Sequence, residues 1–272
     1  MSDVILVVLT RPETAPALLD AAACLAARIG EARIDVLAPR GSAHVNALAA
    51  EVLMDEADTL VAGRGQEQAR VAALRATFDQ WRAGADENAS ACWTEAEGNV
   101  QAIVGKRGSR ADIVVATRPG NGDRLMRQAF HAALFGTGRP VLMMPPIWPN
   151  ATMGRRVAVA WRDEKRAASA LLPALRYFGE LRQIDLLIGV RAGADSPKVP
   201  RVLLEHGIRA DLHVLPIELK PFGQTLLDEA HRLSADLLVM GAYAHSPLRE
   251  LILGGVTRTM LTHADLPVLM RH

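Results

Sequence analysis

The chain carries one pattern twice, and this internal repeat limits the folds that it can adopt. The segment Ala-Asp-Ile-Val-Val at residues 111–115 returns as Ala-Asp-Leu-Leu-Val at residues 235–239. The segment Pro-Val-Leu-Met follows each of them, at residues 140–143 and again at residues 267–270. Short apolar runs bounded by polar residues and glycine are typical of strands buried on both faces of a parallel sheet. The repeat therefore predicts two similar domains in tandem.

Each half alternates predicted strands with predicted helices, as expected for a parallel sheet covered by helices on both faces. In the first half we predict strands at residues 4–9, 33–38, 89–96, 112–116 and 141–144, and helices at 14–29, 42–53, 66–83, 99–107 and 124–135. In the second half we predict strands at residues 157–161, 184–190, 210–216, 237–240 and 268–270, and helices at 164–178, 199–206, 223–234 and 254–263. The sequence thus predicts two doubly wound, Rossmann-like α/β domains, each with a five-stranded parallel sheet.

The two predicted domains span residues 1–146 and 152–272, on either side of a proline-rich joint at residues 145–150. Such a segment is stiff and extended, which is typical of a linker. The first half is longer than the second between its second and third strands. We expect the additional residues to give the first domain an added helical surface. The family resemblance described below implies that the repeated Pro-Val-Leu-Met strands pair within one molecule, and a further homodimer stays open.

Composition excludes several classes of protein. Among 272 residues, half are hydrophobic and 22% are charged, and the formal net charge is +1, so no basic excess indicates a nucleic-acid partner. No apolar run approaches the ~18 residues that cross a bilayer, so we expect no membrane segment. We interpret Cys24 and Cys92 as small buried hydrophobes in a reducing cytosol, and we expect a cytoplasmic protein.

A pair of glycines, Gly254 and Gly255, interrupts the last predicted helix. Two glycines inside a helix cost about 2 kcal/mol relative to alanine, so the chain needs a reason to keep them. One reason is a phosphate group that approaches bare backbone N–H groups at a new helix N-terminus. Another is close packing of the helix on the sheet, which also favours glycine. The local sequence leaves both interpretations open.

The residues around this pair resemble a known family. The spacing of small residues here is similar to the C-terminal signature of the universal stress proteins. It consists of Gly241, two residues, the small Ala244, nine residues, Gly254 and a further small residue. The closing His-Ala-Asp-Leu-Pro-Val-Leu-Met at residues 263–270 is similar to that family's last helix and strand. The resemblance covers both halves of the chain, and it is weaker in the first half. It implies a tandem member of the family, with a fold of the adenine nucleotide alpha hydrolase-like type.

The resemblance implies an ATP site, with magnesium, in the second domain, because many members bind ATP through this loop. Ala244 stands where the family usually has glycine, and Gly255 stands where serine or threonine is usual. Doubly wound folds bind ligands beyond the carboxyl ends of their strands, at the point where the strand order reverses. The residues that we predict to line the nucleotide are Ala160, Trp161, Asp163, Val190, Gly241, Ala244, His245, Gly254, Gly255, Val256 and Thr257.

Trp161 bears most directly on this predicted site. ATP-binding members usually carry an aspartate there, which contacts the ribose, and an indole cannot accept that hydrogen bond. Asp163, two residues on, is a candidate to replace the aspartate from the loop. Trp161 itself could stack on a base or serve as a half-buried packing residue. His245 could touch a phosphate or hold the loop.

The first half lacks the glycine pair and carries Arg118-Pro119 after its fourth strand. A bulky side chain and a ring without an N–H stand where a phosphate cradle needs free donors. We therefore expect the first site to be degenerate, with Arg118 and Arg124 facing solvent or an anion.

Three functions follow from these observations. The first is a stress-response protein that acts by binding an adenine nucleotide and is not an enzyme. The second is a scaffold of the same fold that has lost nucleotide binding and acts through protein partners. The third is a slow ATP hydrolase. Against the third, no residue set in the sequence resembles an activated nucleophile with its base, and no metal-binding motif occurs.

Overall fold

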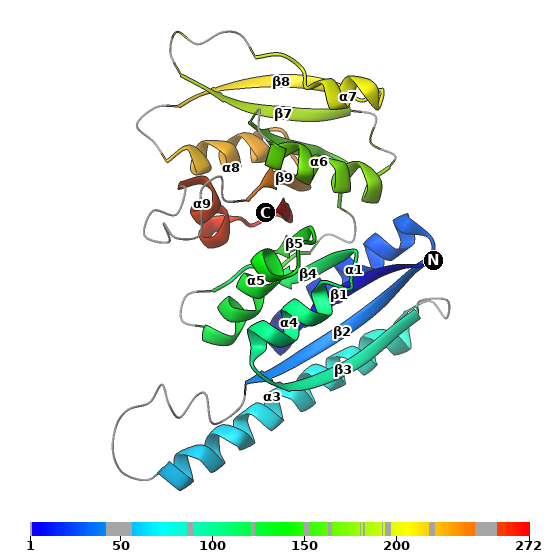
Figure 1. The fold of residues 1–272 in the computed structure, drawn as a ribbon, viewed down its shortest axis with the longest axis vertical. Helices are drawn as coiled ribbons and strands as arrows, with labels where there is room; N and C mark the ends of the chain where they lie inside the picture. The colour runs from blue at the N-terminus through cyan, green and yellow to red at the C-terminus, as the bar shows by residue number, and fades with distance from the viewer. Residues whose placement is uncertain are drawn as a thin grey trace. The chain divides into compact units, whose positions relative to one another are not determined.

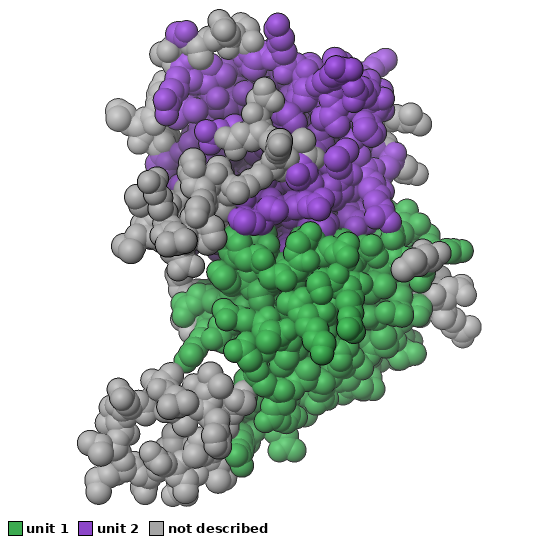
Figure 2. Space-filling model, in the orientation of Figure 1, with its two compact units in different colours: residues 1–139 green, residues 140–272 purple. Residues whose placement is uncertain are grey.

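The structure is a computed structural model, and it divides the chain into two compact units, unit 1 at residues 1–139 and unit 2 at residues 140–272 (Figure 2). It describes residues 2–41, 56–85, 90–120, 123–149, 153–162, 165–179, 181, 183–191, 193, 197–217, 221–242 and 255–272. The predicted helix at residues 42–53 lies outside the described residues. Each unit is therefore described by itself.

Unit 1 is built on parallel strands in the order β3-β2-β1-β4 (Figure 1). These strands are β1 (Asp3–Val8), β2 (Ala32–Gly41), β3 (Ser90–Gly98) and β4 (Ile113–Thr117). β1 is central, with Val7 paired to Val36 on one side and to Val115 on the other. Because β1 and β4 are buried on both faces, they appear in the sequence as continuous apolar runs.

Helices pack against this sheet in two pairs. α1 (Ala15–Ile29), which follows the short 3-10 helix η1 (Pro12–Thr14), packs with α3 (Glu56–Gly84), and α4 (Val100–Gly108) packs with α5 (Arg124–Gly136) (Figure 1). Two of these helices have clear caps. The side chain of Asn99 accepts a hydrogen bond from the amide of Ala102 at 3.0 Å, and Gly30 ends α1 with a φ of 87°.

α3 begins earlier than we predicted, at Glu56 and not at residue 66. Its buried side chains, Val71, Leu74 and Phe78, recur with helical spacing and hold its C-terminal half on the unit. Gly63 and Gly65 lie within the helix, with no atom of the described residues within 4 Å of where a Cβ would stand. Helix-interior glycines lower stability without ending a helix, which explains the underestimate.

Unit 2 contains strands in the order β5-β10-β9-β6-β7-β8. They are β5 (Val141–Met144), β6 (Val157–Trp161), β7 (Gln183–Val190), β8 (Arg209–Pro216), β9 (Leu237–Gly241) and β10 (Val268–Arg271). Its described helices are α6 (Lys165–Tyr177), α7 (Arg201–Glu205), α8 (Phe222–Arg232) and α9 (Gly255–His263). α6 packs on β6, β9 and β10, and α8 packs on α9. The doubly wound α/β fold class is confirmed.

The repeated Pro-Val-Leu-Met segments meet as expected. β5 pairs antiparallel with β10, and Leu142 lies opposite Leu269. This pairing assigns β5 to unit 2, so the boundary between the compact units precedes β5, at residues 139 and 140. The predicted domain boundaries, with the first repeat ending at residue 146 and the second beginning at residue 152, concern the sequence repeat and stay a prediction.

The cysteines differ from the prediction. Cys24 is half-buried and Cys92 is exposed. In β3, Cys92 alternates with the buried Ala91, so the pleat of the strand turns its side chain to solvent. Its thiol donates to the carboxylate of Asp35 at 2.9 Å. Among the helices that the structure describes, none has both the length and the apolar character needed to cross a membrane.

Candidate functional site

The strand order of unit 2 places a switch point at the carboxyl end of β6. β6 lies between β9 and β7, and Ala160 pairs with Met240 on one side and with Leu187 on the other. The chain connects β6 to β7 in one direction and β9 to β10 in the other. Doubly wound folds bind ligands at such a point. Four predicted site residues, Ala160, Trp161, Val190 and Gly241, lie at the carboxyl ends of these three adjacent strands.

The described part of α9 runs from Gly255 to His263, and Gly254 lies outside the described residues, so the predicted break at the glycine pair stays a prediction. No atom of the described residues lies within 4 Å of where a Cβ of Gly255 would stand, and the residue is exposed. No described part of the sheet therefore packs closely enough on Gly255 to require a glycine there. Among the described residues the space is free for an approaching group, and the first amides of a helix carry a partial positive charge. The first turn of α9 contains no acidic residue.

The first turns of α9 are held by α8. A Cβ on Gly223 would lie 2.5 Å from Cβ of Thr259 and 3.1 Å from Cα of Val256. Only glycine permits this approach between the helices. Thr257 is buried, with 4% of its surface exposed, and Val256 is half-buried. The start of α9 is therefore positioned by close contact with the start of α8.

The start of α8 also lies on the end of β7, a contact that the sequence analysis did not predict. A Cβ on Gly189 would lie 2.5 Å from Cζ of Phe222 and 3.1 Å from Cδ1 of Ile217. The amide of Ile217 donates to the carbonyl of Val190 at 3.0 Å. Phe222 and Ile217 thus lie at the end of β7, beside Val190, one of the residues predicted to line the nucleotide. A glycine at the end of a strand is a signal of such close approach.

The remaining predicted residues divide into two groups. Trp161, the last residue of β6, is half-buried and lies opposite Ile188 of β7. The others lie outside the described residues, and they are Asp163, Ala244, His245 and Gly254. The predicted ribose, phosphate and magnesium contacts stay predictions.

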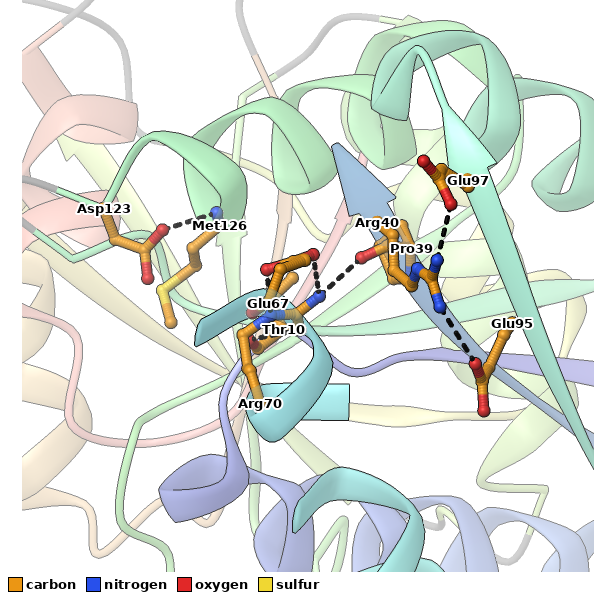
Figure 3. A network of polar contacts seen from close by, with 9 residues as sticks. All are labelled: Thr10, Pro39, Arg40, Glu67, Arg70, Glu95, Glu97, Asp123 and Met126. Atoms are coloured by element: carbon orange, nitrogen blue, oxygen red, sulfur yellow. Dashed lines mark hydrogen bonds and ion pairs between the residues drawn. The ribbon is translucent and has the colours of Figure 1, made fainter. Parts of the chain in front are cut away.

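At the carboxyl edge of unit 1, a side chain of the chain itself bridges two strand ends (Figure 3). Arg70 of α3 donates from Nη1 to the carbonyl of Thr10 at 2.9 Å and from Nη2 to the carbonyl of Pro39 at 2.8 Å. Its Nε and Nη2 also donate to the carboxylate of Glu67, at 2.9 and 2.6 Å. No local signal predicts this contact, because Arg70 lies far from both strands along the chain.

Asp123 occupies the N-terminus of α5 in the same unit. Its carboxylate accepts a hydrogen bond from the amide of Met126 at 2.9 Å (Figure 3) and also pairs with Arg11. Burial opposes ionisation, but the Met126 amide, Arg11 and the more distant Arg70 together lower the pKa of Asp123 below its ordinary value. A carboxylate of the chain thus takes the position where a helix start would attract an anion.

The predicted arginines of unit 1 differ from each other. Arg118 is half-buried and Arg124 is exposed. In the part of the chain that the structure describes, no group of three His, Cys, Asp or Glu side chains is arranged to hold a metal ion.

Comparisons with known proteins agree with this architecture. A sequence model of the Universal stress protein family matches residues 193–272, which contain β8, β9, α9 and β10. No curated protein matches the chain. The matched part includes the candidate site at β9 and α9.

Solved structures extend the likeness to both units. A universal stress protein from Archaeoglobus fulgidus DSM 4304 is similar with a TM-score of 0.67 and 16% identity, covering 100% of this chain and 96% of that chain. A putative universal stress protein from Pseudomonas aeruginosa UCBPP-PA14 has a TM-score of 0.63 and 16% identity, covering 99% of this chain and 93% of that one. At this identity the likeness concerns the fold. Residues 193–272 are thus similar to the Universal stress protein family, and the fold of these solved structures extends along both units of the chain.

Proposed function

We propose that this protein is a cytoplasmic stress-response protein that binds an adenine nucleotide, with ATP and its magnesium as the first candidate, in unit 2. It acts by binding and not by catalysis. The observation that carries the proposal is the open space over Gly255 at the first turn of α9. This space belongs to the unit whose strand order reverses at β6 and β9.

The residues of unit 2 fit such a ligand in two respects. The exposed Gly255 lets an oxygen approach the backbone, and the first amides of a helix favour a phosphate. The ends of β6 and β7 present Trp161 and Val190, whose half-buried surfaces suit a planar base. Phe222 adds a second aromatic ring beside the end of β7.

The test is calorimetry of the full chain with ATP and magnesium, using Gly255→Val as the informative variant. Since the space around Gly255 is open, valine should leave Tm within about 2 °C of the wild type while it obstructs the phosphates. Gly65→Ala, another glycine with open space, is the matched control. We expect heat of binding from the wild type and the control and none from Gly255→Val. No heat at millimolar ATP from the wild type would refute nucleotide binding, and unchanged binding by Gly255→Val would refute the site.

A second candidate function is a scaffold of the same fold without nucleotide binding. Trp161 favours it, because an indole at the end of β6 cannot accept a hydrogen bond from a ribose. Trp161→Asp separates the two candidates. If the unit is a scaffold that has lost its site, the aspartate should create or strengthen ATP binding by at least about tenfold, equivalent to 1.4 kcal/mol. If Trp161 contacts the base, the substitution should weaken binding, and Trp161→Phe should preserve it.

A further inference from the structure

The carboxyl edge of unit 1 presents hydrogen-bond acceptors in the arrangement that a guanidinium group requires. The carbonyls of Thr10 and Pro39 lie at the ends of the adjacent strands β1 and β2, and the Glu67 carboxylate faces them from α3 (Figure 3). All three groups accept and none donates. Such a set favours a cation with several N–H groups and disfavours a phosphate.

Arg70 satisfies this set almost completely. Its contacts to Thr10, Pro39 and both oxygens of Glu67 use four of the five N–H groups of a guanidinium. The side chain is 17% exposed, so the contacts are largely shielded from water. A lysine could not reproduce them, because an ammonium is a compact charge without the planar fork.

The second feature of this edge also excludes anions. Asp123 occupies the N-terminus of α5, where it pairs with Arg11. A phosphate at that position would have to displace a carboxylate that already holds the Met126 amide. The ends of the strands and the start of α5 are therefore both filled by side chains of the chain itself.

We propose that unit 1 carries a guanidinium-binding site, formed by Thr10, Pro39 and Glu67, which the chain fills with its own Arg70. Arg70 is thus an internal ligand that holds α3 on the ends of β1 and β2. A site vacated by truncation of Arg70, with α3 in place, would take a small molecule that carries a guanidinium or amidinium group. This inference does not depend on nucleotide binding by unit 2.

The test is chemical rescue of Arg70→Ala in the full chain. Removing the guanidinium leaves three acceptors without donors, so we expect Tm to fall by about 5 °C and hydrogen exchange in α3 to accelerate. Methylguanidinium at about 20 mM, at constant ionic strength, should restore about half of the lost Tm, because it supplies the same planar fork. Methylammonium should restore none.

Two controls make the rescue specific. Arg64→Ala removes an exposed arginine of the same helix and should change neither Tm nor the response to methylguanidinium. The double variant Glu67→Ala with Arg70→Ala lacks the carboxylate and should lose the rescue. No rescue of Arg70→Ala, or an equal response from the wild type, would overturn the proposal. If Arg70→Ala does not fold, its refolding yield with methylguanidinium becomes the measurement, and an unchanged yield overturns the proposal.

Discussion

The carboxylate of Asp112 accepts a hydrogen bond from the amide of Val4 at 2.9 Å, and the amide of Asp112 donates to the carbonyl of Val4 at 2.8 Å. Asp236 stands in the corresponding place in unit 2, where its amide donates to the carbonyl of Arg156 at 2.9 Å. Its carboxylate also accepts from the amides of residues 154–156. The aspartate of each repeated Ala-Asp pair therefore ties the start of one strand to the start of its neighbour.

This correspondence also shifts the alignment of the two repeats. Ile5 pairs with Ile113 in unit 1, and Val157 pairs with Leu237 in unit 2. The structural equivalent of Val157 is therefore Ile5, although the sequence pattern places it beside Val4. A run of similar apolar residues can be aligned in either register, and hydrogen bonding decides between them.

We predict that Asp236→Ala lowers the free energy of unfolding by about 2–3 kcal/mol, because three amides lose an acceptor. Asp112→Ala, which deprives one amide, should cost about 1 kcal/mol. Asp265→Ala is the control, since that exposed carboxylate only pairs with His231 at the surface. Urea titration of the three variants measures the loss of unfolding free energy in each and so ranks them. Equal losses for Asp236→Ala and Asp265→Ala would contradict the role of Asp236 in joining the two strand starts.

Two glycines should respond oppositely to alanine. Gly223→Ala would place a Cβ 2.5 Å from Cβ of Thr259, which overpacks the contact between α8 and α9 and should cost about 1–3 kcal/mol. Gly65→Ala meets open space inside a helix and should add about 0.5–1 kcal/mol. Thermal unfolding of both variants is the measurement. A stabilised Gly223→Ala would show that the two helices do not depend on this close approach.

Asp123 should make stability depend on pH in the acid range. Since its pKa is lower in the folded chain, its contribution is present above the ordinary carboxyl pKa of about 4 and is lost as pH falls further. Asp123→Asn keeps an acceptor for the Met126 amide but loses the ion pair with Arg11. We expect a deficit of about 0.5–1 kcal/mol at pH 7, which shrinks below about pH 4. A deficit independent of pH between 7 and 3 would exclude the charge as its cause.

Cys92 should react slowly with alkylating agents despite its exposure. Partial desolvation and the neighbouring Asp35 carboxylate raise the pKa of its thiol, so little of the reactive thiolate is present near pH 8. Asp35→Asn removes the negative charge and should increase the rate of alkylation by iodoacetamide several-fold. Mass spectrometry distinguishes the two cysteines, and Cys24 serves as the internal reference. An unchanged rate at Cys92 would mean that Asp35 does not control the thiol.

The sequence predicted the strands well because their burial leaves a local pattern. The apolar runs at β4 and β9 are bounded by the aspartates and turn residues that end buried strands, and the structure places strands there. The glycine pair still predicts a break before α9, because two adjacent glycines interrupt a helical pattern, and Gly254 lies outside the described residues. The N-terminal extent of α3 was underestimated, because Gly63 and Gly65 look like a break there as well.

Side-chain contacts between distant segments could not be predicted in the same way. Nothing near Arg70 indicates that it would reach the carbonyls of Thr10 and Pro39, since backbone acceptors are present at every residue. Phe222 likewise gives no local sign that its ring would cover Gly189. Both contacts depend on how helices cross the sheet.

The amino-acid sequence by itself determined that the chain would form two wound α/β repeats whose repeated Pro-Val-Leu-Met strands meet. Periodicity and small residues act locally, and they act in any tertiary context. Tertiary structure alone decided that unit 1 would fill its carboxyl edge with Arg70 and Asp123, while no described residue of unit 2 fills the space beside Gly255. The physical reason is that hydrogen bonds and steric exclusion require two groups to meet, and only the folded chain determines which groups do.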